Sequence, residues 1–127
     1  MSLYDNLPVY RAGYSFLTDL FRVVTNLPRD YRYSLGDEMK KCVMNILLCI
    51  YKANATTEKY DLLCSACDEM LKVKIYLRVL RDLHLISSKT FSYLAVKEDE
   101  LSRQLIGWRN KQSPSPPGIV AGGVSDA

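Results

Sequence analysis

Residues 60–84, YDLLCSACDEMLKVKIYLRVLRDLH, decide the fold class of this chain. Apolar side chains recur in this stretch at alternating spacings of three and four residues, which is the period of one face of an α-helix. They are Leu63, Ala66, Met70, Val73, Leu77 and Leu80, and the spacing continues to His84. A narrow apolar stripe on a long helix is typical of a helix bundle. His84 is interpreted as a structural residue near the C-terminus of this helix.

Two segments on the N-terminal side show the same period. The first is expected to begin near Pro8 and to end at Pro28, because proline suits a first helical turn but cannot continue a helix. Its apolar stripe comprises Tyr10, Tyr14, Leu17, Phe21, Val24 and Leu27. After a loop over residues 28–33, Ser34 is expected to cap a second helix, with Asp37 in its first turn. The stripe of that helix comprises Met39, Val43, Ile46, Ile50 and Ala53.

The remaining segments complete a bundle. A polar turn over residues 54–57 leads into the helix of residues 60–84, with Thr57 as the expected N-cap. Ser87 or Ser88 is expected to cap the last helix, whose stripe comprises Phe91, Leu94, Glu98, Leu101, Leu105 and Trp108. Four amphipathic helices joined by short turns predict an all-α, antiparallel, up-down-up-down four-helix bundle over residues 1–112. Residues 113–127 are rich in proline, serine and glycine without a helical period, which predicts a disordered tail.

The sequence offers little material for catalysis or for a cofactor. Its glycines do not form a phosphate-binding loop, and its single histidine is already placed on an apolar stripe. The Glu-x-x-His pairs of a di-iron bundle are absent from the sequence. We therefore expect a non-enzymatic protein with no cofactor and no metal. Without a signal peptide or a long apolar run, it is expected to be cytoplasmic and to have no membrane contact.

The cysteines are interpreted as reduced core residues. Cytoplasmic cysteines are rarely oxidised, and free cysteine is among the most buried residue types. Cys42 and Cys49 are about two helical turns apart, too far to share one metal ion. Cys64 and Cys67 form a C-x-x-C, but inside a helical pattern, so a redox or zinc site is the less favoured alternative.

Basic residues are the strongest candidates for binding. The net charge is only +3, from 17 basic and 14 acidic residues, so their placement matters more than their number. Lys74, Arg78 and Arg81 follow helical spacing and are expected to project from one face, extended by Lys52 on the preceding helix. Two arginines in the first loop stand beside tyrosines, a combination suited to nucleic acid. A solvated surface is the alternative for each cluster. The candidate nucleic-acid or partner-binding residues are Arg29, Arg32, Lys52, Lys74, Arg78 and Arg81.

Some residues do not fit a simple stripe. Apolar side chains outside the stripes are Leu47, Leu48, Leu71, Ile75 and Tyr76. Helices with a second apolar stripe often bury it in an oligomer. Glu98 is the opposite exception, because it is a carboxylate within an apolar stripe. It is expected to find a partner in a basic side chain or another subunit, since an unpaired buried carboxylate is costly.

Residues 27–36, LPRDYRYSLG, resemble the signature Phe/Leu-Pro-Lys/Arg-x-x-Arg-Tyr-x-Leu-Gly of a bacterial four-helix-bundle family. That family includes the ribosomal-RNA intervening-sequence proteins and the accessory variability determinant (Avd) proteins of diversity-generating retroelements. A second similar stretch is residues 83–108, and the resemblance covers about residues 8–112.

The resemblance implies an assembly and partners. Avd proteins form ring-shaped homopentamers of bundles, bind the retroelement reverse transcriptase and are thought to engage RNA or DNA during mutagenic retrohoming. The Leu-Gly at residues 35–36 and the Gly-Trp at residues 107–108 favour this branch. The alternative is a four-helix-bundle interaction protein of the intervening-sequence type, with no polymerase partner.

Overall fold

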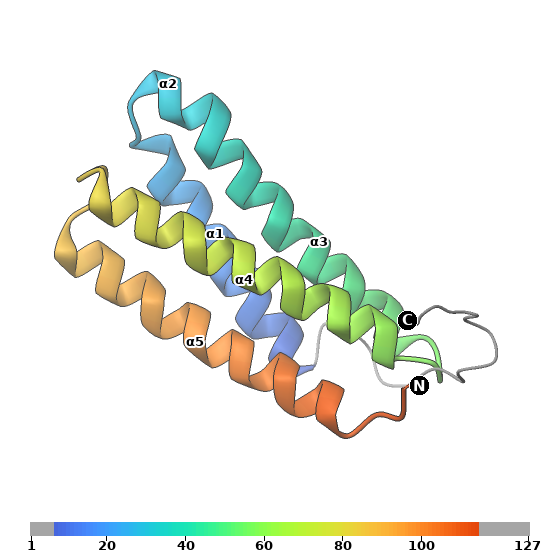
Figure 1. The fold of residues 1–127 in the computed structure, drawn as a ribbon. Helices are drawn as coiled ribbons and strands as arrows, with labels where there is room; N and C mark the ends of the chain where they lie inside the picture. Colours follow the sequence, from blue (N-terminus) through green and yellow to red (C-terminus); the bar gives the residue numbers. More distant parts are fainter. Residues whose placement is uncertain (1–6, 115–127) are drawn as a thin grey trace, which may run out of the picture.

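The structure is a computed structural model that describes residues 7–114; the predictions for residues 1–6 and for the tail beyond residue 114 lie outside the described residues. The long helices are α1 (Pro8–Thr25), α3 (Asp37–Asn54), α4 (Tyr60–Asp82) and α5 (Ser88–Asn110). A short helix α2 (Arg29–Tyr31) and a π-helical turn (Arg32–Gly36) lead directly into α3 (Figure 1). The described part of the chain is therefore all-helical, as predicted.

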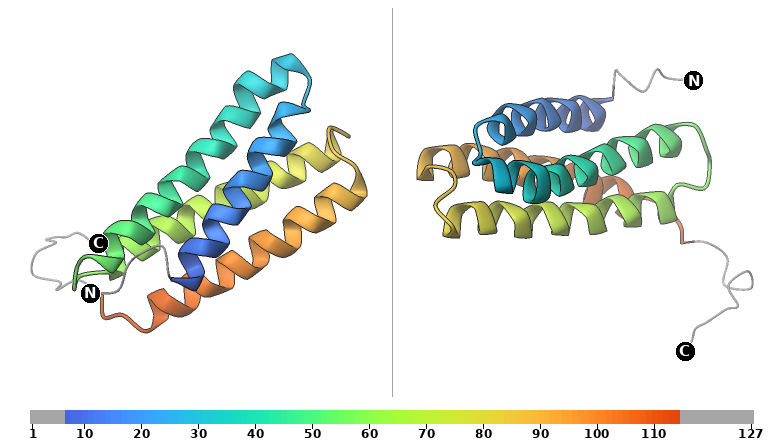
Figure 2. Two further views of the ribbon diagram at one scale, coloured as in Figure 1. Left: turned by 180° about the vertical axis from the view of Figure 1, so that it is seen from behind. Right: turned by 90° about the horizontal axis from the view of Figure 1, so that it is seen from above.

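The four long helices form one bundle in which successive helices run in opposite directions (Figures 1 and 2). Each packs beside the next along the chain, and α5 returns to pack beside α1. The connection between α1 and α3 and the α4–α5 turn lie at one end of the bundle, which we call the tip end. The α3–α4 turn, the start of α1 and the end of α5 lie at the opposite end, the terminal end. The predicted antiparallel four-helix bundle is confirmed.

The core is built from the predicted stripes of α3, α4 and α5. Every residue of the α3 stripe, and of the α4 stripe as far as Leu80, is buried. On α5, Leu94, Leu101 and Leu105 are fully buried, while Phe91 and Trp108 are half-buried near its ends. None of the helices within residues 7–114 combines the length and apolarity needed to cross a lipid bilayer.

The stripe predicted for α1 is partly wrong. Tyr14 and Phe21 are 55% and 47% exposed instead of buried. Two apolar stripes run along α1, and the one that contains Gly13 faces the core. A Cβ at Gly13 would stand only 2.9 Å from Leu47 Cδ2, so glycine allows α1 to approach α3 closely. The buried face of α1 consists of Val9, Gly13, Phe16, Leu17, Asp19, Leu20 and Val24.

The helical segment that comprises α2, the π-helical turn and α3 begins earlier than the sequence predicted. The expected loop over residues 28–33 is mostly helical, because Pro28, with ψ 149°, is already the N-cap of α2. Ser34 is therefore not a cap, and its Oγ donates to the Asp30 carbonyl oxygen at 2.7 Å inside the helical run. At Gly36 the π-helical turn meets α1, where a Cβ would stand 2.6 Å from Val24 Cγ1. A larger residue at position 36 would force Val24 to shift, so glycine suits this crossing.

The two remaining turns show one wrong and one correct cap. Thr57 does not cap α4, which begins at Tyr60 with Lys59 as its N-cap residue. Ser87 caps α5 as expected, since its Oγ accepts a hydrogen bond of 3.0 Å from the Thr90 N–H. Side-chain capping of this kind satisfies one of the free N–H groups of the first turn.

His84 shapes the turn that follows α4. Its φ of 59° is left-handed, and the helix itself ends at Asp82. The Leu85 N–H donates to the Leu80 carbonyl at 2.9 Å, and the His84 N–H donates to the Arg81 carbonyl at 3.0 Å. These two bonds form a Schellman motif, in which the left-handed position is usually glycine. His84 thus has a structural role just beyond the end of α4, but it is exposed and does not continue the buried stripe as expected.

Candidate nucleic-acid interface

Lys74 and Arg78 form an exposed basic pair, one helical turn apart on α4. Within residues 7–114, neither forms an ion pair with an acidic side chain. Burial raises the pKa of the Glu98 carboxyl group on α5, and both positive charges oppose that rise. The pair therefore lies on the side of α4 towards α5, with its charge available to a partner.

Arg81, the third residue of the predicted α4 patch, is already engaged. Its Nε donates to Asp82 Oδ1 at 3.0 Å. Its guanidinium carbon lies 4.8 Å from the centroid of the Phe91 ring near the start of α5. This cation–π contact holds Arg81 across the α4–α5 turn. The structure thus assigns Arg81 to helix packing, whereas Lys74 and Arg78 remain available.

Glu98 is buried, with only 4% of its surface exposed. Burial raises the pKa of its carboxyl group, and Asp99 adds to the rise, while Lys74 and Arg78 oppose it. No ion pair joins Glu98 to either residue in the described structure. The charges of Lys74 and Arg78 therefore act on Glu98, but the ion pair expected for this carboxylate is not formed within residues 7–114.

Arg29 and Arg32 lie at the tip end, in α2 and the π-helical turn. Arg29 is exposed, whereas Arg32 is half-buried. The Arg32 Nη2 donates to the Leu27 carbonyl at 3.3 Å, and its guanidinium carbon lies 5.8 Å from the Tyr33 ring centroid. The buried Nε of Arg32 has no hydrogen-bond partner. Arg32 therefore ties the start of the α3 run back to the end of α1.

Lys52 does not extend the basic patch on α4. It lies near the C-terminal end of α3, at the terminal end of the bundle. Because α3 and α4 are antiparallel, Lys52 stands beside the beginning of α4. Arg78 lies 18 residues beyond Tyr60, about 27 Å along the helix at a rise of about 1.5 Å per residue. The placement predicted for Lys52 is wrong, because the antiparallel arrangement sets Lys52 beside the first turns of α4 and not beside Lys74 and Arg78.

Large apolar side chains are exposed on each of the four long helices. On α4, Leu71 and Ile75 are 59% and 60% exposed. Of the other apolar residues predicted outside the stripes, Leu47 is buried and Tyr76 packs partly against the core. Between α1 and α3 lies an open groove of ≈ 350 Å³, which the sequence did not reveal. It is lined by Tyr10, Tyr14, Leu17, Met44, Leu47, Leu48 and Tyr51.

The whole bundle, from the first turn of α1 to the end of α5, corresponds to one known protein family. Residues 9–112 match the bAvd-like family. The chain belongs to this family. The resemblance to Avd-type proteins that rested on the residue 27–36 signature is thereby confirmed. No curated protein is detectably similar to this bAvd-like chain.

A polar cluster joins α1 to α5 of this bAvd-like protein, and sequence reasoning missed it. Asp19, 8% exposed, accepts a hydrogen bond of 3.1 Å from the Tyr93 hydroxyl and another from the Lys97 ammonium group. Arg22 pairs with the same carboxylate at 3.3 Å, and Lys97 also donates to Ser15 Oγ at 2.7 Å. Partial burial lowers the pKa of Lys97, but the hydrogen bonds to Asp19 and Tyr93 outweigh this effect, so the pKa of Lys97 is raised.

The sequence contains a hint of this cluster, because Ser15 and Asp19 are four residues apart, as are Tyr93 and Lys97, which places each pair on one helix face. Only the fold brings α1 and α5 together.

The cysteines of this bAvd-like chain favour packing over chemistry. All four are free, with Cys42 buried and the others half-buried. Burial, aided by a hydrogen bond with Glu69, raises the pKa of Cys42 to about 11, and burial also raises the pKa of Cys49 and of Cys67. Because the thiolate is the nucleophile and the metal ligand, these shifts lower the reactivity of the three thiols.

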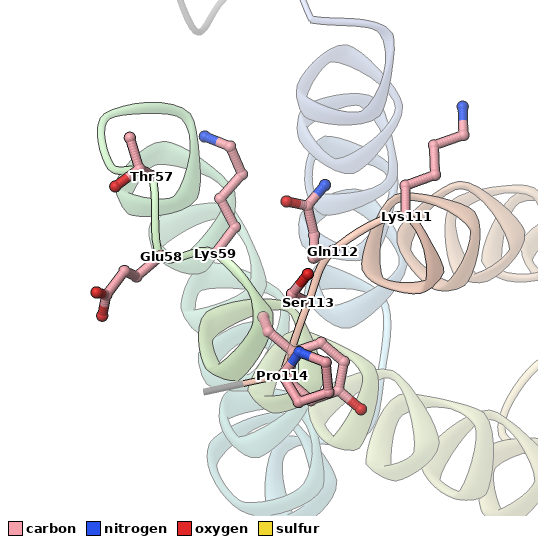
Figure 3. A pocket seen from close by; sticks show the side chains of 8 residues that line it. Thr57, Glu58, Lys59, Lys111, Gln112, Ser113 and Pro114 are labelled. Carbon is pink, nitrogen blue, oxygen red and sulfur yellow. The ribbon is translucent and has the colours of Figure 1, made fainter. Parts of the chain in front are cut away.

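A polar pocket lies at the terminal end of the bundle (Figure 3). It has a volume of ≈ 310 Å³ and lies between the α3–α4 turn and the end of α5. Lys59 and Lys111 extend on either side of Gln112. The Lys59 ammonium group donates to the carbonyl oxygens of Ala53 and Thr56 and so closes the C-terminus of α3. Lys59 is therefore committed to the bundle, which weakens the case for a ligand site here.

Proposed function

We propose that this protein is a non-enzymatic accessory protein of a diversity-generating retroelement. It binds the reverse transcriptase of that element and RNA or DNA during mutagenic retrohoming. Membership of the bAvd-like family supports the retroelement context. The observation that carries the interface is the exposed, unpaired basic pair Lys74 and Arg78 on α4. Cations of this kind contact phosphates, which set the position of a protein on nucleic acid.

The proposal includes a ring-shaped homopentamer. The exposed Leu71 and Ile75 on α4 and the groove between α1 and α3 are two different apolar surfaces on one chain. Contact between two different patches of identical subunits is heterologous, and it closes into a ring when the rotation between subunits allows. Burial of these surfaces in an assembly would remove apolar area from water, which favours association.

The test neutralises the basic pair without reversing its charge, because reversal would raise the pKa of the nearby buried Glu98 more than neutralisation does. In the Lys74→Gln/Arg78→Gln variant, binding to the reverse transcriptase of the same retroelement should weaken at physiological salt. Binding to a labelled single-stranded RNA should also weaken, and its log–log salt slope should fall by about 0.7 for each lost phosphate contact. Arg81 is left intact because of its contact with Phe91.

The matched control is Lys41→Gln/Lys72→Gln, which removes the same charge from two exposed lysines. Each of them pairs with a glutamate three residues earlier, and their side chains are 71% and 61% exposed. The control should keep wild-type affinity and salt slope. Equal binding by both double variants would refute the assignment of Lys74 and Arg78. Failure of the unmodified protein to bind the reverse transcriptase would favour the intervening-sequence type instead.

A further inference from the structure

Most residues of the signature at residues 27–36 have a structural task. Leu27 is buried, at 2% exposure, and Pro28 starts the helical run that becomes α3. Arg32 donates to the Leu27 carbonyl, and Gly36 allows the π-helical turn to meet α1. These tasks account for the hydrophobic residue, the proline, the second arginine and the glycine. Tyr33 is different, because its side chain is not part of the core.

Tyr33 is 64% exposed, more than any other tyrosine among the large exposed apolar residues. The guanidinium carbon of Arg32 lies 5.8 Å from its ring centroid, within the range of a cation–π contact. Since Arg32 is itself fixed by its bond to the Leu27 carbonyl at 3.3 Å, it provides a defined neighbour for the ring. The result is a flat aromatic surface at the tip end, with a cation on one side and much of its area in water.

The surroundings of Tyr33 are polar and partly basic. Arg29, Asp30 and Ser34 are all exposed. Neither Arg29 nor Arg32 pairs with an acidic side chain in the described part of the chain. A protein-docking aromatic residue is usually set in an apolar patch, whereas the exposed residues beside Tyr33 in this turn are polar except for Tyr31, which is 36% exposed. An aromatic ring with unpaired arginines matches the stacking platforms that bind single-stranded nucleic acid.

We infer that Arg29, Arg32 and Tyr33, the tip site, bind an unpaired nucleotide of RNA or DNA. The base stacks on the Tyr33 ring, and Arg29 contacts the adjoining phosphate. A base inside a duplex is already stacked on its neighbours, so the tip site selects single-stranded segments. This inference rests on the proposed function, because it specifies which form of nucleic acid the protein contacts. The tip end is also remote from the start of α1 and the end of α5, which lie at the terminal end (Figure 2).

The test uses the full chain and a single-stranded oligonucleotide that contains 2-aminopurine, whose fluorescence falls when the base stacks. The wild-type protein should quench it, and Tyr33→Ala should bind about tenfold more weakly and lose the quenching. Tyr33→Phe keeps the ring and should retain both properties. The control is Val96→Ala, which truncates an apolar side chain of 68% exposure on α5 and should bind normally. Duplex DNA of the same sequence should bind Tyr33→Ala and wild type equally.

Each other outcome has a distinct meaning. If Tyr33→Ala binds the oligonucleotide as wild type does, in a salt-dependent manner, the tip site is refuted and the proposed function stands. If Tyr33→Ala loses only the reverse transcriptase, the tip site is a protein contact and the inference is wrong. If the wild-type protein binds no oligonucleotide at all, both the tip site and the nucleic-acid part of the proposed function fail. Circular dichroism checks that each variant keeps its helices.

Discussion

Replacement of Asp19 by asparagine should destabilise the bundle by about 2–3 kcal/mol. The substitution keeps the shape of the side chain but removes the charge that faces Lys97, whose side chain is only 27% exposed. Loss of one partner from a fully buried ion pair costs about 3–5 kcal/mol, because the other charge stays buried. The lower figure applies here because Lys97 keeps some contact with water and its bond to Ser15. The melting temperature should fall by roughly 8–12 °C.

Urea unfolding followed by circular dichroism measures this change, and the midpoint should fall while the slope m stays constant. In a double-mutant cycle, Asp19→Asn/Lys97→Met should recover part of the lost stability, with a coupling energy above about 1.5 kcal/mol. The control is Asp99→Asn, which removes an exposed partner of Arg103 at 3.1 Å and should cost less than about 0.5 kcal/mol. Equal losses for Asp19→Asn and Asp99→Asn would refute the role of the α1–α5 cluster.

Two further predictions concern Glu98 and assembly. Burial raises the pKa of Glu98 above its ordinary value of 4.5, so the folded state holds this proton more tightly than the unfolded state, and its contribution to stability falls as pH rises from about 4.5 through the folded pKa. Glu98→Gln should therefore stabilise the protein at pH 7 by about 1 kcal/mol and much less at pH 4, and a destabilised variant at pH 7 would contradict this. Light scattering of the wild type should give five times the protomer mass of 14.5 kDa, and Leu71→Glu/Ile75→Glu should lower it while helicity is retained; a monomer mass for the wild type would exclude the ring.

The sequence predicted most of the bundle because α3, α4 and α5 each carry one dominant apolar stripe, which can face the core in only one way. α1 carries two. Periodicity alone could not choose between the stripe of Tyr14 and that of Phe16, because both have helical spacing. The choice depends on the close contact of Gly13 with α3, which is a tertiary interaction. The start of the helical segment that leads into α3 was predicted too late, because Ser34 followed by Asp37 resembles an N-cap in the sequence. The sequence does not reveal that Ser34 lies inside a π-helical turn.

The candidate site was less predictable, because the availability of a basic residue depends on its neighbours in space. Lys74, Arg78 and Arg81 are equivalent by spacing, yet only Arg81 lies over an aromatic ring contributed by the next helix. Lys52 has the right type of side chain but stands at the wrong end of an antiparallel neighbour.

Spatial neighbours also distinguish the roles of the signature residues 27–36. The sequence pattern does not distinguish the roles of residues 27–36. The structure separates the residues that stabilise the turn from those whose side chains are exposed on it. Gly36 and Leu27 are explained by a close crossing and by burial, so their presence needs no ligand. Folding gives no such account of the exposed ring of Tyr33, since an aromatic surface in water contributes little to stability. The exposed ring of Tyr33 is therefore the part of this turn to which the proposed tip site assigns the contact with nucleic acid.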